Sequence, residues 1–243
     1  MDRKMRLSIG LSAILMATLA ADLYAGDVIA TSVATNGGSS SSTATAYGNG
    51  SAAAHSAATN GGRAVANAEA VGNRNGTAVS TALAVADHGL AVSNSRALAD
   101  GRLGGRSVAV SDSLAASVGG VALSNSLADA RSARGGAAVS RSSSLALSRY
   151  GVATSDSVAR ANGVFRGRAE ASSDSTADTT GGVATSRVHA DAAGRWHGTA
   201  VSNGLGVSMS GPARRSSANV RASSSSTWFG NSRSDAASIE VRH

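Results

Sequence analysis

Few residues of this chain combine the types and the spacing that catalysis or metal binding requires. His189 and Asp191 are two residues apart, so on a β-strand they would share one face, and His197 follows them closely. Imidazole and carboxylate groups bind zinc, but a zinc site takes three or four such ligands. Two ligands at strand spacing are too few, so the sequence predicts no metal site and no cofactor.

Serine and glycine are abundant, but their surroundings do not suggest an active site. No serine lies in a nucleophile-elbow pattern with a histidine and an acid placed to activate it. The glycine pairs lack the strand–loop–helix context and the following lysine of a phosphate-binding loop. We therefore expect that the chain is not an enzyme.

Aromatic residues are the one local feature that suggests binding. Phe165, Trp196 and Trp228 occupy equivalent positions in successive repeats, Phe229 follows the last of them, and Tyr150 lies in the opposite turn of the repeat. If the repeats stack, these side chains form a row that could contact sugar rings or a partner chain. They could also merely shield the turn edge. The candidate ligand or partner edge is therefore Tyr150, Phe165, Trp196, Trp228 and Phe229.

The elements that would position these residues are repeats, because a glycine returns at nearly constant intervals from Gly62 to Gly198. Between the glycines, small and variable residues alternate, as in the small positions Ser124, Ser126 and Ala128. Period two is typical of a β-strand, whereas a helix needs spacings of three and four. The uniform Ala/Ser face must be the crowded inner one, since the charges of the other face cannot be buried without partners.

Two kinds of turn alternate along the chain, so strand–turn units of about 15–16 residues pair into units of 31 residues. Two all-β architectures fit this pattern. In an elongated β-solenoid each coil is one 31-residue unit with both Ala/Ser faces turned inward. In an antiparallel β-meander each unit is a hairpin whose small face stays uncovered. We favour the solenoid because it buries the small face within one chain.

The chain divides into four segments. Residues 1–25 have a basic start, a short apolar run and a small-residue boundary, which predicts a secretory signal peptide rather than a membrane span. Residues 26–61 are a low-complexity leader or degenerate first coils, and residues 62–210 are the β-repeat domain. Residues 211–243 are an irregular repeat or cap. No later segment is apolar enough to be transmembrane.

Composition supports export and allows an anionic partner. Without residues 1–25 the chain keeps 19 arginines and 13 acidic residues, a net charge of +6. Arginine binds carboxylate, sulfate and phosphate through its planar fork, so a polysaccharide or other polyanion is a possible partner. The arginines are scattered among acids, however, which does not favour a specific nucleic-acid site. Cysteine is absent, so no disulfide stabilises the fold.

The units 89–99 and 105–115 resemble the Ser/Ala/Gly head repeats of trimeric autotransporter adhesins. That resemblance implies a β-roll on a cell surface that contacts host matrix or other cells. We expect an exported structural or adhesive protein of the cell surface or extracellular matrix, as in biofilms, with the periplasm as an alternative location. A polysaccharide- or polyanion-binding module is the alternative function. Unpaired strands at the ends of the stack also predict self-association.

Overall fold

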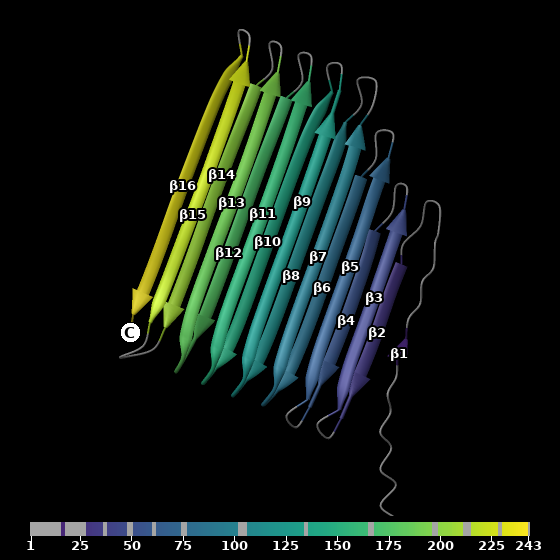
Figure 1. Ribbon diagram of the computed structural model, residues 1–243, viewed down its shortest axis with the longest axis vertical. Coiled ribbons are helices and arrows are strands. Elements are labelled where there is room, and N and C mark those ends of the chain that lie inside the picture. Colours follow the sequence, from purple (N-terminus) through teal and green to yellow (C-terminus); the bar gives the residue numbers. More distant parts are fainter. Residues whose placement is uncertain are drawn as a thin grey trace, which may run out of the picture.

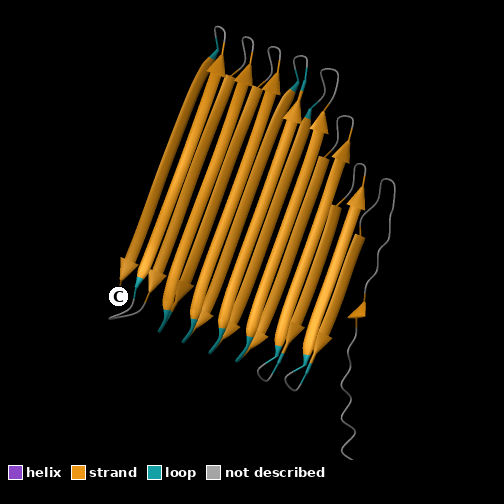
Figure 2. Ribbon diagram, in the orientation of Figure 1, coloured by secondary structure: helices purple, strands orange, loops and turns teal. Residues whose placement is uncertain are grey.

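The computed structural model describes residues 16–17, 28–35, 38–47, 51–59, 62–73, 77–101, 106–133, 136–164, 168–195, 199–210, 215–227 and 230–242. Within these ranges all regular secondary structure is β-strand and no helix occurs (Figure 2). The described residues accordingly hold no helix with the length and hydrophobicity to cross a membrane. The predicted all-β class is confirmed.

Sixteen strands make up this part of the chain, and from β5 onward each is 11 to 13 residues long. Their bounds are β1 Met16–Ala17, β2 Val28–Ala34, β3 Ser39–Tyr47, β4 Ser51–Ala58, β5 Arg63–Asn73, β6 Thr77–Asp87, β7 Leu90–Gly101, β8 Ser107–Val118, β9 Val121–Ser132, β10 Ala137–Arg149, β11 Val152–Val164, β12 Arg168–Thr179, β13 Val183–Arg195, β14 Thr199–Ser210, β15 Ser216–Thr227 and β16 Asn231–Arg242.

Successive strands alternate between two sheets (Figure 1). Strands β1, β3 and onward to β15 form one sheet, here the odd sheet, and strands β2, β4 and onward to β16 form the even sheet. Every pairing is parallel and joins strands two apart in the chain. A coil produces this pattern and a hairpin cannot, so the fold is a β-solenoid and the meander alternative is wrong.

The coil lengthens along the chain. Near the start Ser39 pairs with Arg63, whereas further along Ala78 pairs with Ala109, so the interval between paired residues grows. The 31-residue interval is reached at this point, continues through the middle of both sheets and becomes slightly longer in the last coil. The predicted 31-residue coil is confirmed, and strands β2 to β4 form shorter coils of the same stack.

The interior of the solenoid consists almost wholly of alanine and serine. In β9 every even-numbered residue from Ala122 to Ser132 is buried, and every odd-numbered residue is partly or fully exposed. The buried residues elsewhere are also alanine, serine or glycine, with the exceptions of Val139, Thr179 and Val188. The inward direction that the alternation predicts for the small face is therefore correct.

Serine hydroxyls join the two sheets across this interior. Ser95 donates to the carbonyl of Ser80 at 2.6 Å, and Ser144 donates to the carbonyl of Ser124 at 2.7 Å. These carbonyls can accept a second hydrogen bond because each oxygen has two lone pairs. A serine side chain is only two bonds long, so the sheets must lie well inside the usual ~10 Å spacing of stacked sheets. Only alanine, serine and glycine suit most of this space.

These contacts connect into two serine ladders along the solenoid. In each ladder every hydroxyl after the first donates a hydrogen bond to the hydroxyl or the carbonyl of the preceding serine. The first ladder contains Ser80, Ser95, Ser111, Ser126, Ser142, Ser157 and Ser173; the second contains Ser93, Ser113, Ser124, Ser144, Ser155, Ser175 and Ser186. The buried hydroxyls of the two ladders thus find hydrogen-bond partners, whereas those of Ser42, Ser210 and Ser216 have none among the described residues.

Both ladders end at a small group of valines and glycines. Val188 takes the place of Ser157 in the next coil, and Val220 follows it. The facing strand β14 has glycine at both ladder positions: a Cβ added to Gly204 would lie 3.1 Å from Val188 and 3.0 Å from Val220. A Cβ added to Gly206 would lie 2.6 Å from Val220. Two valines therefore occupy space that two glycines leave open; these four residues are called the valine plug.

Glycine is required at one of the two turns. A Cβ on Gly120 would collide with the carbonyl of Gly89, and one on Gly151 would collide with the carbonyl of Gly120. The reason is close approach of successive coils, since φ is not in the left-handed region at either residue. This explains why glycine recurs once per coil at this turn.

The C-terminal end of the stack is only partly covered. The inward side chains of β15 are half-buried beyond Ser216, and residues 231–240 of β16 are exposed. Glu240, which continues the column of Ser208, accepts a hydrogen bond from the N–H of Ala218 at 3.0 Å. The inward carboxylate of Glu240 thus satisfies one backbone N–H of β15, the last strand of the odd sheet. Such charges hinder the addition of a further strand.

Candidate functional site

The predicted aromatic edge is described at one residue only. Tyr150 lies in the turn between β10 and β11, with 68% of its side chain exposed. Phe165, Trp196, Trp228 and Phe229 lie outside the described residues. The structure therefore locates one member of the proposed edge and leaves the aromatic row as a prediction.

Tyr150 belongs to a column of turn residues that contains one residue from each of four successive coils: His88, Gly119, Tyr150 and Gly181. Three of them have a left-handed backbone: His88 with φ 53°, Gly119 with φ 70° and Tyr150 with φ 65°. The ring of His88 lies over Gly119, and the ring of Tyr150 lies over Gly181, so that an added Cβ on either glycine would be 2.9 Å from the ring. Large side chains and glycines alternate, and each ring covers the glycine of the following coil.

The two rings have different charged neighbours. The Arg149 guanidinium carbon lies 5.9 Å from the centre of the Tyr150 ring, which is cation–π distance. Nδ1 of His88 lies 2.6 Å from a carboxylate oxygen of Asp87. This turn edge thus displays an aromatic ring next to an exposed cation, a pair that suits sugar rings carrying anionic groups.

The outer face of the odd sheet holds an amide ladder. Nδ2 of Asn94 donates to Oδ1 of Asn67 at 2.8 Å, and Nδ2 of Asn125 donates to Oδ1 of Asn94 at 2.9 Å. The next residue of the column is Asp156, whose carboxylate cannot donate to Asn125. Arg187 follows, and its guanidinium lies 3.9 Å from the carboxylate of Asp156. Sequence inspection missed this column, because Asn67, Asn94 and Asn125 are separated by unequal intervals and only the strand register aligns them.

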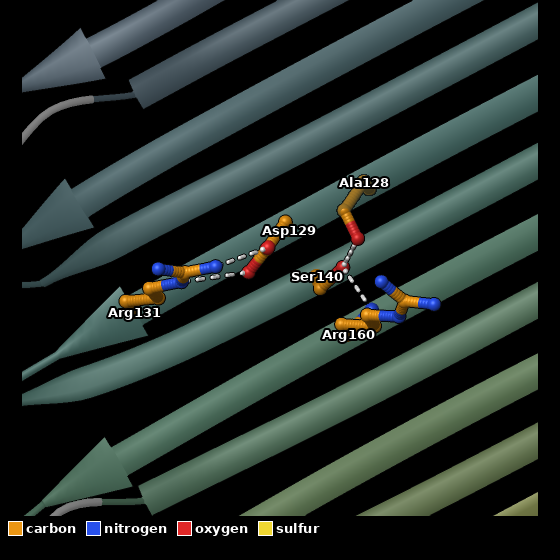
Figure 3. A network of polar contacts seen from close by, with 5 residues as sticks. All are labelled: Ala128, Asp129, Arg131, Ser140 and Arg160. Carbon is orange, nitrogen blue, oxygen red and sulfur yellow. Dashed lines mark hydrogen bonds and ion pairs between the residues drawn. The ribbon is translucent and has the colours of Figure 1, made fainter.

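A charged cluster lies beside the amide ladder on the same face (Figure 3). Asp129 accepts hydrogen bonds from Nη2 of Arg131 at 3.0 Å and from its Nε at 3.4 Å. This carboxylate holds the pKa of Arg131 above its ordinary value. Arg160 lies in the same column as Asp129 and has no ion-pair partner among the described residues. The cluster therefore offers one guanidinium that is not already neutralised by a contact.

The backbone beneath Arg160 is fixed from inside the solenoid. Ser140 of the even sheet donates to the carbonyl of Ala128 at 2.7 Å and accepts from the N–H of Arg160 at 3.1 Å (Figure 3). One hydroxyl thereby bridges β9 and β11 of the other sheet. Ser80 makes the same bridge between Ala68 and Arg96. An inward serine therefore holds the strand segments from which Arg96 and Arg160 project.

Three adjoining grooves follow the odd sheet across its strands. The first has a volume of about 540 Å³ and is lined by the amide ladder together with Arg96, Asp156 and Arg160. The second, of about 220 Å³, shares Arg96 with the first. The third, of about 460 Å³, shares Arg160 with the first and Asp129 and Arg131 with the second. Amide, carboxylate and guanidinium groups thus line one long path, and these groups hydrogen-bond to sugar hydroxyls and to anions.

His189 and Asp191 do not form a metal site in the described part of the chain. Nε2 of His189 lies 2.6 Å from Oδ2 of Asp191, and the Ser223 hydroxyl contacts the other oxygen of this carboxylate. Groups of three or more metal-ligating side chains do not occur among the described residues. His197 lies outside them.

Burial perturbs three aspartates on the outer faces. Desolvation raises the pKa of Asp112 and of Asp174 on the even sheet. Desolvation also raises the pKa of Asp156 on the odd sheet, and the nearby Arg187 opposes this effect. One oxygen of Asp156 is buried without a hydrogen-bond partner.

Comparisons with protein families, with curated proteins and with solved structures find no match for this chain. The similarity of units 89–99 and 105–115 to adhesin head repeats therefore stays a resemblance of pattern. Function has to be argued from the geometry of the two outer faces.

Proposed function

We propose that this chain is an exported structural or adhesive repeat protein of the cell surface or extracellular matrix, without catalytic activity. The observation that carries the proposal is the division of chemistry between the inside and the outside. The serines of the two ladders are buried, hydrogen-bonded to one another and closed to substrate. The outward residues form columns that repeat once per coil along two long faces.

This arrangement suits the display of outward side chains to a partner and not the turnover of a substrate. The stacked backbone holds outward side chains ~4.7–4.9 Å apart along each column, whichever residues occupy them. A regular array of this kind can contact a surface at many points, and many weak contacts together give strong attachment. The predicted signal peptide supplies the route to the outside of the cell.

A deletion strain tests the structural role. Loss of the chain should reduce attachment or biofilm mass, and the wild-type chain supplied in trans should restore it. A strain supplied with the chain lacking residues 1–25 is the matched control, because it produces the same repeats without the predicted export signal. Unchanged attachment after deletion would contradict the proposal.

The grooves of the odd sheet favour a second candidate function, the binding of an anionic polysaccharide. Arg160 is exposed in two of the grooves, and Arg141 is an exposed arginine on the even sheet. Arg160→Gln should lower the salt concentration that elutes the chain from heparin, whereas Arg141→Gln should not. Equal effects of the two substitutions would indicate general charge attraction and would refute a site in the grooves.

A further inference from the structure

The amide ladder of the odd sheet ends at a residue that breaks its pattern. Asn67, Asn94 and Asn125 follow one another in register, and the next residue of the column is Asp156. Nδ2 of Asn125 already donates to Asn94, and no donor among the described residues reaches its Oδ1. An ionised carboxylate has no proton to offer that oxygen. Two acceptors therefore face each other at this step, whereas the two earlier steps each pair a donor with an acceptor.

Asp156 itself has an incomplete set of partners. Its Oδ2 lies 3.9 Å from the guanidinium of Arg187, and its Oδ1 is buried without a hydrogen bond. Desolvation raises the pKa of this carboxyl. An asparagine at this position would continue the ladder, so the carboxylate is the less favourable group for the fold. Groups that a protein keeps at such a cost are concentrated at functional sites.

The carboxylate of Asp156 lies in the first groove, together with Arg160 of the same strand. Four residues separate the two along β11, which is ~13 Å at the rise of a parallel strand. Between them lies the outward side chain of Val158, and Leu127 lies beside Val158 in register. Both aliphatic side chains are half-buried and line the groove. This part of the groove therefore has an apolar floor, with acceptors at one end and a guanidinium at the other.

The guanidinium of Arg160 is available to a ligand. It is exposed and points away from the Asp129–Arg131 pair (Figure 3). The two aspartates in the column of Arg160 are engaged elsewhere, because Asp129 accepts from Arg131 and Asp191 is hydrogen-bonded to His189. The cation can therefore form a two-pronged contact with a carboxylate that enters the groove.

We infer that this part of the first groove binds a uronic acid residue of an acidic polysaccharide. In a uronic acid the carboxylate on C5 lies across the pyranose ring from the hydroxyls of C2 and C3. These groups match the two ends of the site, which is called the uronate subsite and consists of Asn125, Leu127, Asp156, Val158 and Arg160.

Each part of the subsite has one task. The guanidinium of Arg160 binds the sugar carboxylate. The ring hydroxyls donate to the carboxylate of Asp156 and to Oδ1 of Asn125, which supplies the missing protons at this step of the ladder. The C–H face of the sugar ring packs on Leu127 and Val158. A neutral sugar would leave Arg160 without a partner, so a uronic acid satisfies more of the site.

This inference rests on the second candidate function, the binding of an anionic polysaccharide, and names the sugar that the groove recognises. Titration of the purified chain with polygalacturonate tests it. Asp156→Asn should weaken binding by roughly tenfold or more, because the charged acceptor is lost and the new amide occupies Oδ1 of Asn125. The melting temperature of this variant should not fall, so weaker binding cannot be attributed to misfolding.

Asp112→Asn is the matched control. Asp112 is also half-buried, and desolvation raises its pKa too, but it lies on the even sheet and lines none of the three grooves. General charge attraction predicts that both substitutions strengthen the binding of a polyanion, since each removes a negative charge. The uronate subsite predicts the opposite sign for Asp156→Asn alone.

The possible results separate the subsite from the function on which it rests. Weaker binding of polygalacturonate by Asp156→Asn, with unchanged or tighter binding by Asp112→Asn, would support the subsite. Equal effects of the two substitutions, or unchanged or tighter binding by Asp156→Asn, would refute it and leave general anion binding intact. A wild-type chain that binds heparin and not polygalacturonate would refute it as well. Binding of neither polymer would refute the second candidate function together with the subsite.

Discussion

The valine plug offers a stringent test of how the interior is packed. One coil earlier, Ser157 and Ser173 occupy the positions of Val188 and Gly204, and their hydroxyls are 2.8 Å apart. Gly204→Ser alone would bring a Cβ to 3.1 Å from a methyl group of Val188. Overpacking of this kind typically costs about 1–3 kcal/mol.

Val188→Ser alone should also destabilise the fold, because it removes buried methyl groups and leaves a space beside Gly204. Loss of this size costs about 1–2 kcal/mol, since buried methyl groups each contribute about 1 kcal/mol. The double variant fills the space beside Gly204 and lets the introduced hydroxyls reproduce the Ser157–Ser173 contact, but the Cβ at position 204 still lies 3.0 Å from Val220. We expect the double variant to be more stable than the sum of the two single effects predicts, with a coupling of about 1–2 kcal/mol between the two substitutions.

Denaturant unfolding followed by far-UV circular dichroism measures these differences. Stacked repeats can melt from one end, so amide hydrogen exchange of β13 and β14 should accompany the unfolding curves. Gly204→Ser combined with Asn125→Ala is the control, because these sites are distant and their effects should add. If Val188→Ser and Gly204→Ser also proved additive within about 0.5 kcal/mol, the packing argument for the plug would be wrong.

Three further predictions concern the core and the carboxylates. Ala128→Leu or Ala146→Leu should cost about 1–3 kcal/mol or more in denaturant unfolding by overpacking the interior. Asn125→Leu should cost less, about 0.5–1 kcal/mol, because it loses only the exposed hydrogen bond to Asn94; equal costs would contradict the facing of the strands. Asp156→Asn should raise stability at pH 7 by about 0.5–1.5 kcal/mol, because an amide there can donate to Asn125 and extend the ladder; a lower melting temperature would count against it. Burial raises the pKa of Asp112 in the folded state, so the folded chain binds this proton more tightly than the unfolded chain. Its contribution to stability should be fully present below the ordinary value of 3.8 and lost as pH rises through the raised pKa, and Asp112→Asn should remove this dependence in unfolding curves measured from pH 3 to pH 7.

Much of the fold could be predicted because its rules are local. Strict alternation specifies strands, and uniform small residues such as Ala128 and Ser126 specify which face is crowded. The 31-residue interval specifies the length of the repeat, and the alternation within each unit excludes helical repeats. The choice between solenoid and meander needed the structure, since both architectures share the same period and the same facing.

The outer-face sites could not be predicted in the same way. Asn94 and Asn125 are polar residues at variable positions, and only the parallel register shows that their amides lie one above the other. Arg160 is likewise ordinary in sequence, and its place between two grooves depends on strands far apart in the chain. The register of the parallel strands decides which outward side chains are neighbours, and the alternation within one strand does not specify that register.

The interior explains why the two faces can serve different purposes. Backbone hydrogen bonds hold each sheet together, and serine hydrogen bonds join the two sheets without any outward side chain. Outward substitutions therefore cost little stability, and each face can be specialised independently of the other. On the odd sheet the amide ladder and the grooves lie beside an aliphatic column that contains Leu90, Val121, Val152 and Val183, so the outward chemistry changes from column to column while the interior stays the same.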